Sequence, residues 1–328
     1  MFEIKLKNNK SFTCDKDSTI FEAAKKSDII LEHSCLSSRC RSCVVKILSG
    51  KTINKAEEMV LSEEDKNANY VLSCNAKPIS DIELDIEDLG QITLFKKIII
   101  PSKINFIEKV TNDIIRIVLR IPPNSLFRFN SGQYVNIIKA NIIRSYSIAN
   151  SSDHQNELEF FIKKYKNGLM SNYFFEEAKI NDLLRLEGPI GTFFLRESSF
   201  ENIIFLATGT GIAPIKSILE ELEKSHEKYQ NKNFWLIVGA RFKEDLFWQP
   251  IFKNLNINYI PVLSRQINDW NGAQGYVQDI VLKQQIDLEN TQVYACGSND
   301  MINSAKELFL KNNLKENNFF SDAFVQTN

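Results

Sequence analysis

Histidine is nearly absent from this sequence. The 328 residues include three histidines, His33, His154 and His226, which lie in three different regions. An iron–sulfur centre of the Rieske type needs two histidine ligands beside its cysteines, so this kind of centre is excluded. No motif supports a serine or cysteine hydrolase triad either.

Net charge and long hydrophobic runs are missing as well. Forty basic residues face 41 acidic ones, which leaves a net charge of −1 and no electrostatic argument for binding nucleic acid or a membrane. No apolar run approaches the roughly 18 residues that span a bilayer. The opening stretch 1–6 alternates like a strand rather than a signal peptide, so we expect a cytoplasmic protein.

Cysteine is sparse, but its spacing is informative. Cys35, Cys40 and Cys43 follow the pattern C-x4-C-x2-C, and Cys74 comes about thirty residues later. This is the plant-type [2Fe–2S] spacing. Each iron of such a cluster needs two thiolates, so a tight loop supplies three ligands and a distant segment supplies the fourth. A site of this kind transfers single electrons.

Two other uses of cysteine compete with an iron–sulfur cluster. Four thiolates can also hold structural zinc, but zinc sites usually consist of two close C-x2-C pairs, and the four-residue gap is atypical. Six cysteines in 328 residues are too few for a disulfide scaffold. Of the remaining two, Cys14 is predicted to be a small buried side chain, and Cys296 lies far from it in the sequence.

The pattern of the chain changes twice, and at this length two or three domains are expected. Residues 1–92 predict short strands and two helices, the latter from capping boxes at Thr19 and Ser62. The predicted strands are Phe2–Lys7, Ser11–Thr13, Val44–Leu48 and Ile82–Ile86. Together with the cysteine loop, this region resembles a β-grasp ferredoxin domain.

Residues 98–197 lose helical periodicity, and short apolar runs alternate with turn signals. This rhythm predicts a small antiparallel barrel with one helix, over Ser171–Ala178. The predicted strands are Ile114–Ile121, Gln133–Lys139, Ser145–Ala149, Leu158–Lys163 and Leu183–Glu187.

Residues 200–328 alternate between strands and helices, which predicts a parallel sheet covered on both faces. The sequence therefore predicts a multidomain protein with α+β and α/β parts. The predicted strands and helices of this region are Ile203–Ala207, Pro214–Lys224, Phe234–Val238, Tyr259–Leu263, Gln292–Ala295 and Ser304–Leu310.

The stretch 144–150 reads R-S-Y-S-I-A-N and lies in the predicted barrel. Between a ferredoxin-like region and a parallel sheet, it resembles the R-x-Y-S flavin signature of the ferredoxin–NADP reductase superfamily. The resemblance implies that Arg144 pairs with the flavin pyrophosphate, that Tyr146 stacks on the isoalloxazine ring and that Ser147 lies near flavin N5.

A second element, 168–171, resembles the superfamily's G-x-x-S flavin motif. The resemblance implies that Gly168, Met170 and Ser171 bind the pyrophosphate at a helix N-terminus, where free N–H groups face phosphate. An ordinary glycine turn with a serine cap is the alternative.

A third element, 208–214, reads T-G-T-G-I-A-P, follows a predicted strand and opens a helix. The superfamily shows this G-x-G-x-x-P form where it binds nicotinamide dinucleotides, because glycine lets the backbone approach the pyrophosphate. The cofactor contacts that this implies are Gly209, Thr210, Gly211 and Pro214.

The resemblance implies four further cofactor contacts, Arg241, Cys296, Gly297 and Phe324. Tyr146, Ser147 and Cys296 are the implied catalytic residues, although Cys296 is equally consistent with packing. The resemblance favours NADH. NADPH is the alternative, because no acidic residue ends the second strand to select the ribose 2′-hydroxyl and Arg241 tolerates a phosphate.

The resemblance covers essentially the whole chain and implies three cofactors, a [2Fe–2S] cluster, FAD and NADH. FAD is favoured over FMN because the relatives with an N-terminal ferredoxin region contain FAD. The implied activity is hydride transfer from NADH to FAD, followed by single-electron transfer through the cluster to an electron-accepting partner protein.

The cysteine loop bears on the identity of that partner. Many reductase components of bacterial mono- and dioxygenases have glycine where this loop has Ser38 and Arg41. The loop and the ending 321–324 instead resemble the reductases that serve CDP-4-keto-6-deoxyhexose 3-dehydrases in 3,6-dideoxysugar synthesis. We therefore expect such a dehydrase as acceptor, with an oxygenase as the alternative and a zinc-stabilised binding protein as a third hypothesis. Arg39 and Arg41 either act on the cluster or its partner, or face solvent.

Overall fold

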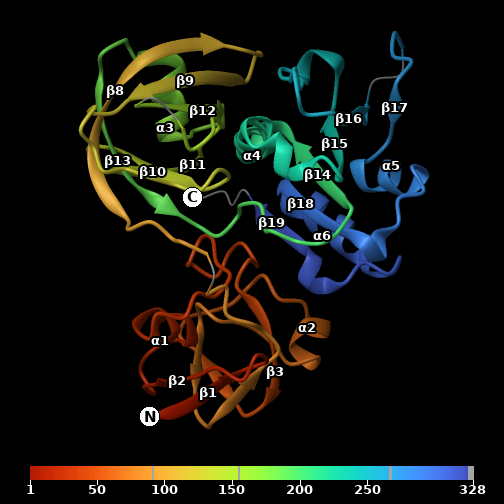
Figure 1. The fold of residues 1–328 in the computed structure, drawn as a ribbon. Helices are drawn as coiled ribbons and strands as arrows, with labels where there is room; N and C mark the ends of the chain where they lie inside the picture. Colours follow the sequence, from red (N-terminus) through yellow and green to blue (C-terminus); the bar gives the residue numbers. More distant parts are fainter. Residues whose placement is uncertain (91, 154–155, 266–267, 324–328) are drawn as a thin grey trace. The chain divides into compact units, whose positions relative to one another are not determined.

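The computed structural model describes residues 1–328 except 91, 154–155, 266–267 and 324–328. His154 and the predicted flavin contact Phe324 therefore lie outside the described residues. The chain forms two compact units, one from Met1 to Leu94 and one that begins at Phe95 (Figure 1).

The N-terminal unit is a five-stranded sheet of order β2-β1-β7-β3-β5. β1 runs parallel to β7, and the other pairs are antiparallel. This is the predicted β-grasp arrangement. The strands are β1 (Phe2–Leu6), β2 (Ser11–Cys14), β3 (Val44–Ser49), β5 (Tyr70–Leu72) and β7 (Ile82–Leu84), with a separate pair of β4 (Thr52–Asn54) and β6 (Ala76–Pro78).

Both predicted capping boxes begin a helix. Thr19 precedes α1 (Ile20–Lys26), where its hydroxyl accepts from the Glu22 N–H and the Glu22 carboxylate accepts from the Thr19 N–H. Ser62 and Asp65 do the same for α2 (Glu63–Asn67). Four residues of α1 are buried in the core of the sheet, whereas α2 buries none.

The second unit begins with an antiparallel sheet of order β11-β10-β13-β8-β9-β12. Just beyond β11, the Ala149 N–H donates to the Glu159 carbonyl of β12, so the two edge strands meet and the sheet curls into the predicted barrel. The elements are β8 (Ile98–Lys109), β9 (Ile114–Arg120), β10 (Tyr134–Lys139), β11 (Ile142–Ser147), β12 (Glu157–Lys163), α3 (Leu169–Asn172), a π-helical turn (Tyr173–Glu177) and β13 (Leu183–Ile190).

A six-stranded parallel sheet of order β17-β16-β15-β14-β18-β19 follows. Helix α4 lies on one face, and α5 and α6 lie on the other, as predicted (Figure 1). The elements are β14 (Asn202–Thr208), α4 (Ile212–Lys224), β15 (Asn233–Ala240), β16 (Ile257–Leu263), β17 (Ala273–Gln274), α5 (Val277–Lys283), β18 (Thr291–Gly297), α6 (Asn299–Leu310) and β19 (Phe319–Ala323), with 3-10 turns at Gly209–Gly211, His226–Tyr229, Lys243–Asp245, Leu288–Asn290 and Glu316–Asn318.

Several predicted boundaries were wrong. The barrel helix begins at Leu169 rather than Ser171, and α6 begins at Asn299 because the Ser298 hydroxyl caps it by accepting from the Met301 N–H. Between β15 and β16, residues 241–256 are all described and contain one 3-10 turn instead of a helix.

One hydrophobic core joins the barrel to the parallel sheet. Ala149 and Phe161 of the barrel pack with Phe205 of β14, Ile215 of α4 and Cys296 of β18. Each large apolar side chain buried there contributes about 1.5–3 kcal/mol. This shared core explains why the two sheets form a single compact unit.

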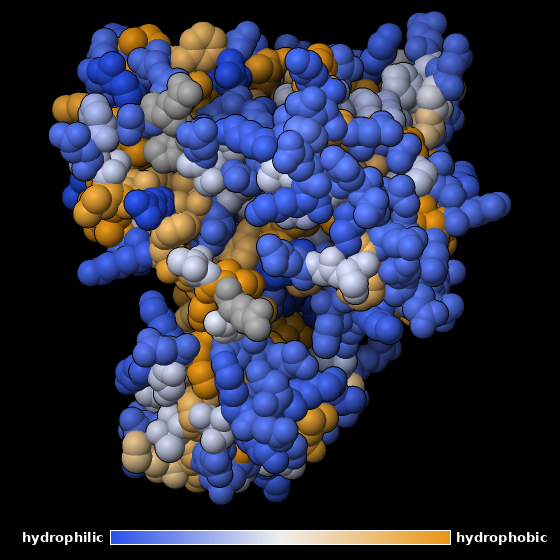
Figure 2. All heavy atoms as spheres, viewed as in Figure 1, coloured by the Kyte–Doolittle hydropathy of each residue, from blue (hydrophilic) through white to orange (hydrophobic). Residues whose placement is uncertain are grey.

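The face drawn in Figure 2 is mostly polar. Hydrophilic residues dominate the face in Figure 2, and hydrophobic ones occur in small groups. None of the described helices combines the length and the hydrophobicity that crossing a bilayer requires.

Candidate functional site

The four predicted cluster cysteines come together as two pairs. Cys40 Sγ accepts a hydrogen bond from the Cys35 N–H at 3.4 Å, and Cys43 Sγ lies 3.2 Å from Cys74 Sγ. Among the described residues, no three metal-binding side chains converge on one point as a single ion would require. Two pairs fit a two-iron centre, because each iron takes two thiolates.

In each pair of cysteines, one thiol has a lowered pKa. The pKa of Cys35 is lowered to about 5, mainly by a hydrogen bond from Cys40, and the pKa of Cys74 is lowered to about 7, mainly by one from Cys43. The Ser37 N–H also donates to Cys35 Sγ at 3.4 Å. Each pair therefore holds one readily formed thiolate, the form that binds metal.

The loop reaches this shape through left-handed backbone at three residues that are not glycine, Leu36, Ser38 and Arg41, with φ of 51°, 60° and 62°. Arg41 Nη1 donates to the Val60 carbonyl at 2.6 Å and to Asp65 Oδ2 at 2.7 Å. Arg41 thus ties the loop to the N-terminus of α2, whereas Arg39 is exposed. Neither of the two sequence hypotheses for Arg41 predicted this contact, because it joins residues that are far apart in the sequence.

The predicted flavin strand is β11. Arg144 and Tyr146 are half-buried, and Ser147 is buried opposite Tyr134 of β10. The Tyr146 ring meets Phe174 edge to face, with centroids 6.2 Å apart. Burial raises the pKa of Tyr146, so its hydroxyl stays protonated at neutral pH. Arg144 Nη1 donates to the Ile143 carbonyl at 2.8 Å.

The second predicted flavin element packs against β11. Gly168 is the N-cap of α3 and has no side chain that could cap the helix. The Ser171 hydroxyl lies within the helix, donates to the Gly168 carbonyl and accepts from the Tyr165 N–H. The alternative of a serine cap was therefore wrong. The Met170 side chain is buried in the barrel core, which leaves its backbone as the part that can reach a cofactor.

The predicted dinucleotide turn joins β14 to α4. Gly209 has a φ of 55°, and open space lies where a side chain would project, so a phosphate can approach its backbone. Thr210 and Pro214 are buried instead. A Cβ at Gly211 would lie 2.2 Å from the Cys296 carbonyl oxygen, so this position requires glycine for the packing of the turn on β18.

Cys296 and Gly297 end β18 beside this turn. A Cβ at Gly297 would lie 2.1 Å from Thr208 Oγ1, a residue that the sequence interpretation did not select. The Cys296 side chain is fully buried, and this burial raises its pKa. The thiol packs in the shared core, while the backbone of Cys296 and Gly297 faces the turn.

Arg241 follows β15 and is exposed. The N–H of Arg265, which follows β16, donates to its carbonyl at 3.1 Å. Two guanidinium-bearing residues therefore sit at adjacent strand ends. Sequence analysis missed Arg265, although its position two residues after a predicted strand was a usable signal.

Comparisons with known proteins identify the family of each part of the chain. Three family models match consecutive parts of the chain: a 2Fe-2S iron-sulfur cluster binding domain at residues 4–78, an oxidoreductase FAD-binding domain at 101–195 and an oxidoreductase NAD-binding domain at 205–307.

Relatives match over nearly their full lengths. The CDP-6-deoxy-L-threo-D-glycero-4-hexulose-3-dehydrase reductase of Yersinia pseudotuberculosis is 42% identical over 96% of this chain and 95% of its own. The phenol hydroxylase P5 protein of Acinetobacter pittii is 29% identical over 95% and 90%. The crystal structure of the Amycolatopsis cytochrome P450 reductase GcoB shares the fold, with a TM-score of 0.72, 20% identity and 99% coverage of both chains.

Proposed function

The chain belongs to the ferredoxin–NAD(P) reductase superfamily, among the reductases that carry a [2Fe–2S] cluster, FAD and a nicotinamide site, and from this we propose that its electron acceptor is a CDP-4-keto-6-deoxyhexose 3-dehydrase. The protein is an NAD(P)H-dependent oxidoreductase. The proposal concerns its partner and the residues that hold its cofactors.

The similarity to the Yersinia reductase carries the proposal for the acceptor. Identity of 42% extends over 96% of the chain, compared with 29% for the phenol hydroxylase component. The non-glycine residues Ser38 and Arg41 of the cysteine loop agree with this preference.

The cofactors together convert a hydride into single electrons, because flavin accepts both electrons of a nicotinamide and a [2Fe–2S] cluster takes one. Residues in each part of the chain are assigned to bind these cofactors. We propose that Cys35, Cys40, Cys43 and Cys74 ligate the irons.

The flavin is assigned to β11 and α3. Arg144 would neutralise its pyrophosphate, Tyr146 would cover its ring, and the backbone around Gly168 would face its phosphates. Ser147 is assigned to the ring near N5. The nicotinamide dinucleotide is assigned to the turn at Gly209 and the backbone of Gly297.

An oxygenase remains the second candidate acceptor, because reductase components of phenol and naphthalene oxygenases match over most of this chain. Their similarity is lower, at 29% and 26% identity. Both classes of acceptor would receive electrons from the same cluster.

An acceptor assay tests the proposal. The protein is prepared without air, reduced with NADH, and mixed with a purified hexulose dehydrase or with a purified phenol hydroxylase oxygenase component. We expect NADH-dependent turnover with the dehydrase, and loss of that turnover in Cys74→Ser. Turnover with the oxygenase alone would overturn the assignment. Comparing kcat/KM for NADH and NADPH in the same assay tests the preference for NADH.

A further inference from the structure

A buried lysine connects the dinucleotide turn to the flavin strand. Lys216 belongs to α4, the helix that begins directly after Gly211. Its Nζ donates to the Ala149 carbonyl at 3.0 Å, to Glu159 of β12 at 2.7 Å and to Glu220 at 2.6 Å. Ala149 comes two residues after Ser147, the last residue of β11.

The next residue of the helix makes a second connection. Ser217, which is fully buried, donates to the Asn150 carbonyl at 2.6 Å and accepts from the Gly132 N–H at 3.2 Å. The Asn150 side chain in turn accepts from the Glu159 N–H at 2.8 Å. Ala149 and Asn150, the last residues of the R-S-Y-S-I-A-N stretch, are thus held by α4.

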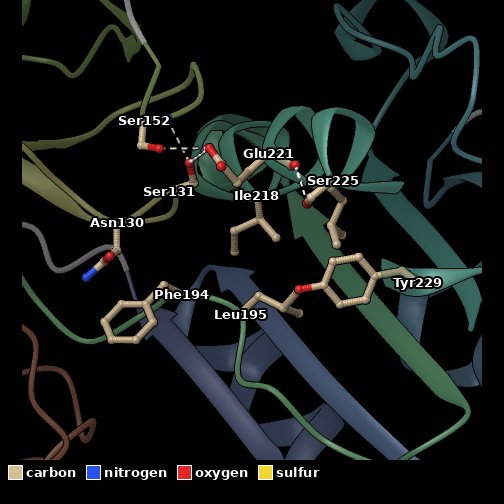
Figure 3. Close-up of a pocket in the computed structure, with 10 residues that line it drawn as sticks. Asn130, Ser131, Ser152, Phe194, Leu195, Ile218, Glu221, Ser225 and Tyr229 are labelled. Carbon is tan, nitrogen blue, oxygen red and sulfur yellow. Dashed lines mark hydrogen bonds between the residues drawn. The ribbon is translucent and has the colours of Figure 1, made fainter. Parts of the chain in front are cut away.

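Figure 3 shows a further part of the same contact. Glu221 accepts hydrogen bonds from Ser131 at 3.3 Å and from Ser152 at 2.8 Å, beside a cavity of about 200 Å³. Both serines come from barrel loops. Four residues of α4 therefore meet the barrel through polar bonds: Lys216, Ser217, Glu220 and Glu221.

Charged side chains are unusual at a buried contact between a helix and a barrel. Lys216 and Glu159 are each 7% exposed, and Arg116 also donates to Glu159 at 2.6 Å. A well-packed apolar contact would often stabilise the fold as much as a buried ion pair does. What the ion pair adds is a defined geometry, because its hydrogen bonds hold only in one relative placement of helix and strand.

We propose that Lys216 and Ser217 are positioning residues for hydride transfer: they fix the placement of the dinucleotide turn relative to the flavin strand. The inference rests on the assignment of these two elements to nicotinamide and flavin. Hydride transfer requires close contact of the reacting atoms, and a misplacement of about 1 Å can lower its rate by about 100-fold.

The test uses the full-length holoprotein. Flavin reduction by NADH is followed by rapid mixing in Lys216→Met and Ser217→Ala, together with the dissociation constant of NADH and the isotope effect with NADH deuterated at C4. We expect Lys216→Met to lower the limiting rate by about 10- to 100-fold while NADH affinity changes by less than about threefold. Ser217→Ala should show a smaller loss of rate, and the isotope effect should change in both.

Lys306→Met is the matched control. Lys306 lies on α6, outside this contact, and its Nζ lies 2.8 Å from Glu316 Oε1. It should retain the wild-type rate. Wild-type rates in Ser217→Ala and in folded Lys216→Met would refute the inference, as would a loss of rate matched by loss of bound FAD. If Lys216→Met does not fold, Ser217→Ala decides alone. A wild-type protein whose flavin is not reduced by NADH or NADPH would instead contradict the reductase function itself.

Discussion

Ser38 and Arg41 hold left-handed backbone in the cysteine loop, and each such residue costs about 1–2 kcal/mol relative to glycine. Arg41 offsets this cost, because its guanidinium bonds to Val60 and Asp65, and hydrogen bonds of charged groups contribute about 1.5–3 kcal/mol. Ser38 has a much weaker contact, a hydroxyl 3.9 Å from Cys74 Sγ.

The two positions should therefore respond oppositely to glycine. We expect Ser38→Gly to stabilise the cluster loop by about 1 kcal/mol and Arg41→Gly to destabilise it by a similar amount. The rate of loss of cluster absorbance in urea measures both. Faster loss in Ser38→Gly, or slower loss in Arg41→Gly, would show that the side-chain bonds are not what holds the loop.

Cys74→Ser removes one proposed ligand of the cluster but none of the residues assigned to flavin or nicotinamide. Electron export to a protein acceptor should fall below detection, while NADH-dependent reduction of flavin and of small dyes changes little. Cys14→Ala is the control, because Cys14 is a buried thiol of the same unit whose pKa is raised to about 11 by burial. It should retain the cluster spectrum. Equal loss of export and dye reduction in Cys74→Ser contradicts separate sites.

At the scale of elements, the two glycines of the β14–α4 turn differ in role, because one is required for packing and the other leaves its backbone open to a ligand. Gly211 has no room for a side chain against Cys296, whereas Gly209 has open space. Gly211→Ala should therefore destabilise the second unit by about 1–3 kcal/mol, the usual cost of overpacking a core.

Gly209→Ala should instead fold, at a cost of about 1 kcal/mol for its left-handed φ, and weaken NADH binding because the added methyl group obstructs the phosphate. Thermal unfolding and NADH titration distinguish the two variants. Unaltered NADH affinity in Gly209→Ala would place the pyrophosphate elsewhere.

Several strands were not predicted from the sequence, for different physical reasons. β8 was not predicted and contains Pro101, a residue that sheets hold mainly at edges. It pairs with β13 over residues 98–103 and with β9 over 103–109. Pro101 therefore lies where the strand has one partner, which a proline tolerates. β17 is an edge strand of two residues, which is too short to show a period. β19 is an edge strand whose partner lies 26 positions earlier in β18, where Val293 is opposite Phe319.

At the scale of the whole second unit, acid should weaken the contact between α4 and the barrel. Burial alone would raise the pKa of Glu159, but Lys216 and Arg116 outweigh it and lower the pKa below its ordinary range. A lowered folded pKa means that the stabilisation is complete above the unfolded pKa of about 4.3 and is lost as the pH falls through the folded value.

We therefore expect the unfolding free energy of the wild type to fall below about pH 4.3 more steeply than that of Glu159→Gln. Glu176→Gln, which alters a surface pair with Lys164, serves as control and should follow the wild type. Denaturant unfolding followed by flavin fluorescence measures all three. Parallel curves for wild type and Glu159→Gln would exclude Glu159 as a source of the acid sensitivity.

The sequence by itself determined the order of the three cofactor-binding regions, the spacing of the four cysteines proposed as ligands, both capping boxes and most strands, because these depend on motifs, spacing and periodicity along the chain. Only the tertiary structure decided that Arg41 reaches Asp65, that the Cys296 side chain is buried, and that Lys216 holds Ala149. Those contacts join residues from 24 to 67 positions apart, and no local pattern encodes such a distance. Folding brings them together, because burying their apolar neighbours in one core leaves polar groups that must find partners there.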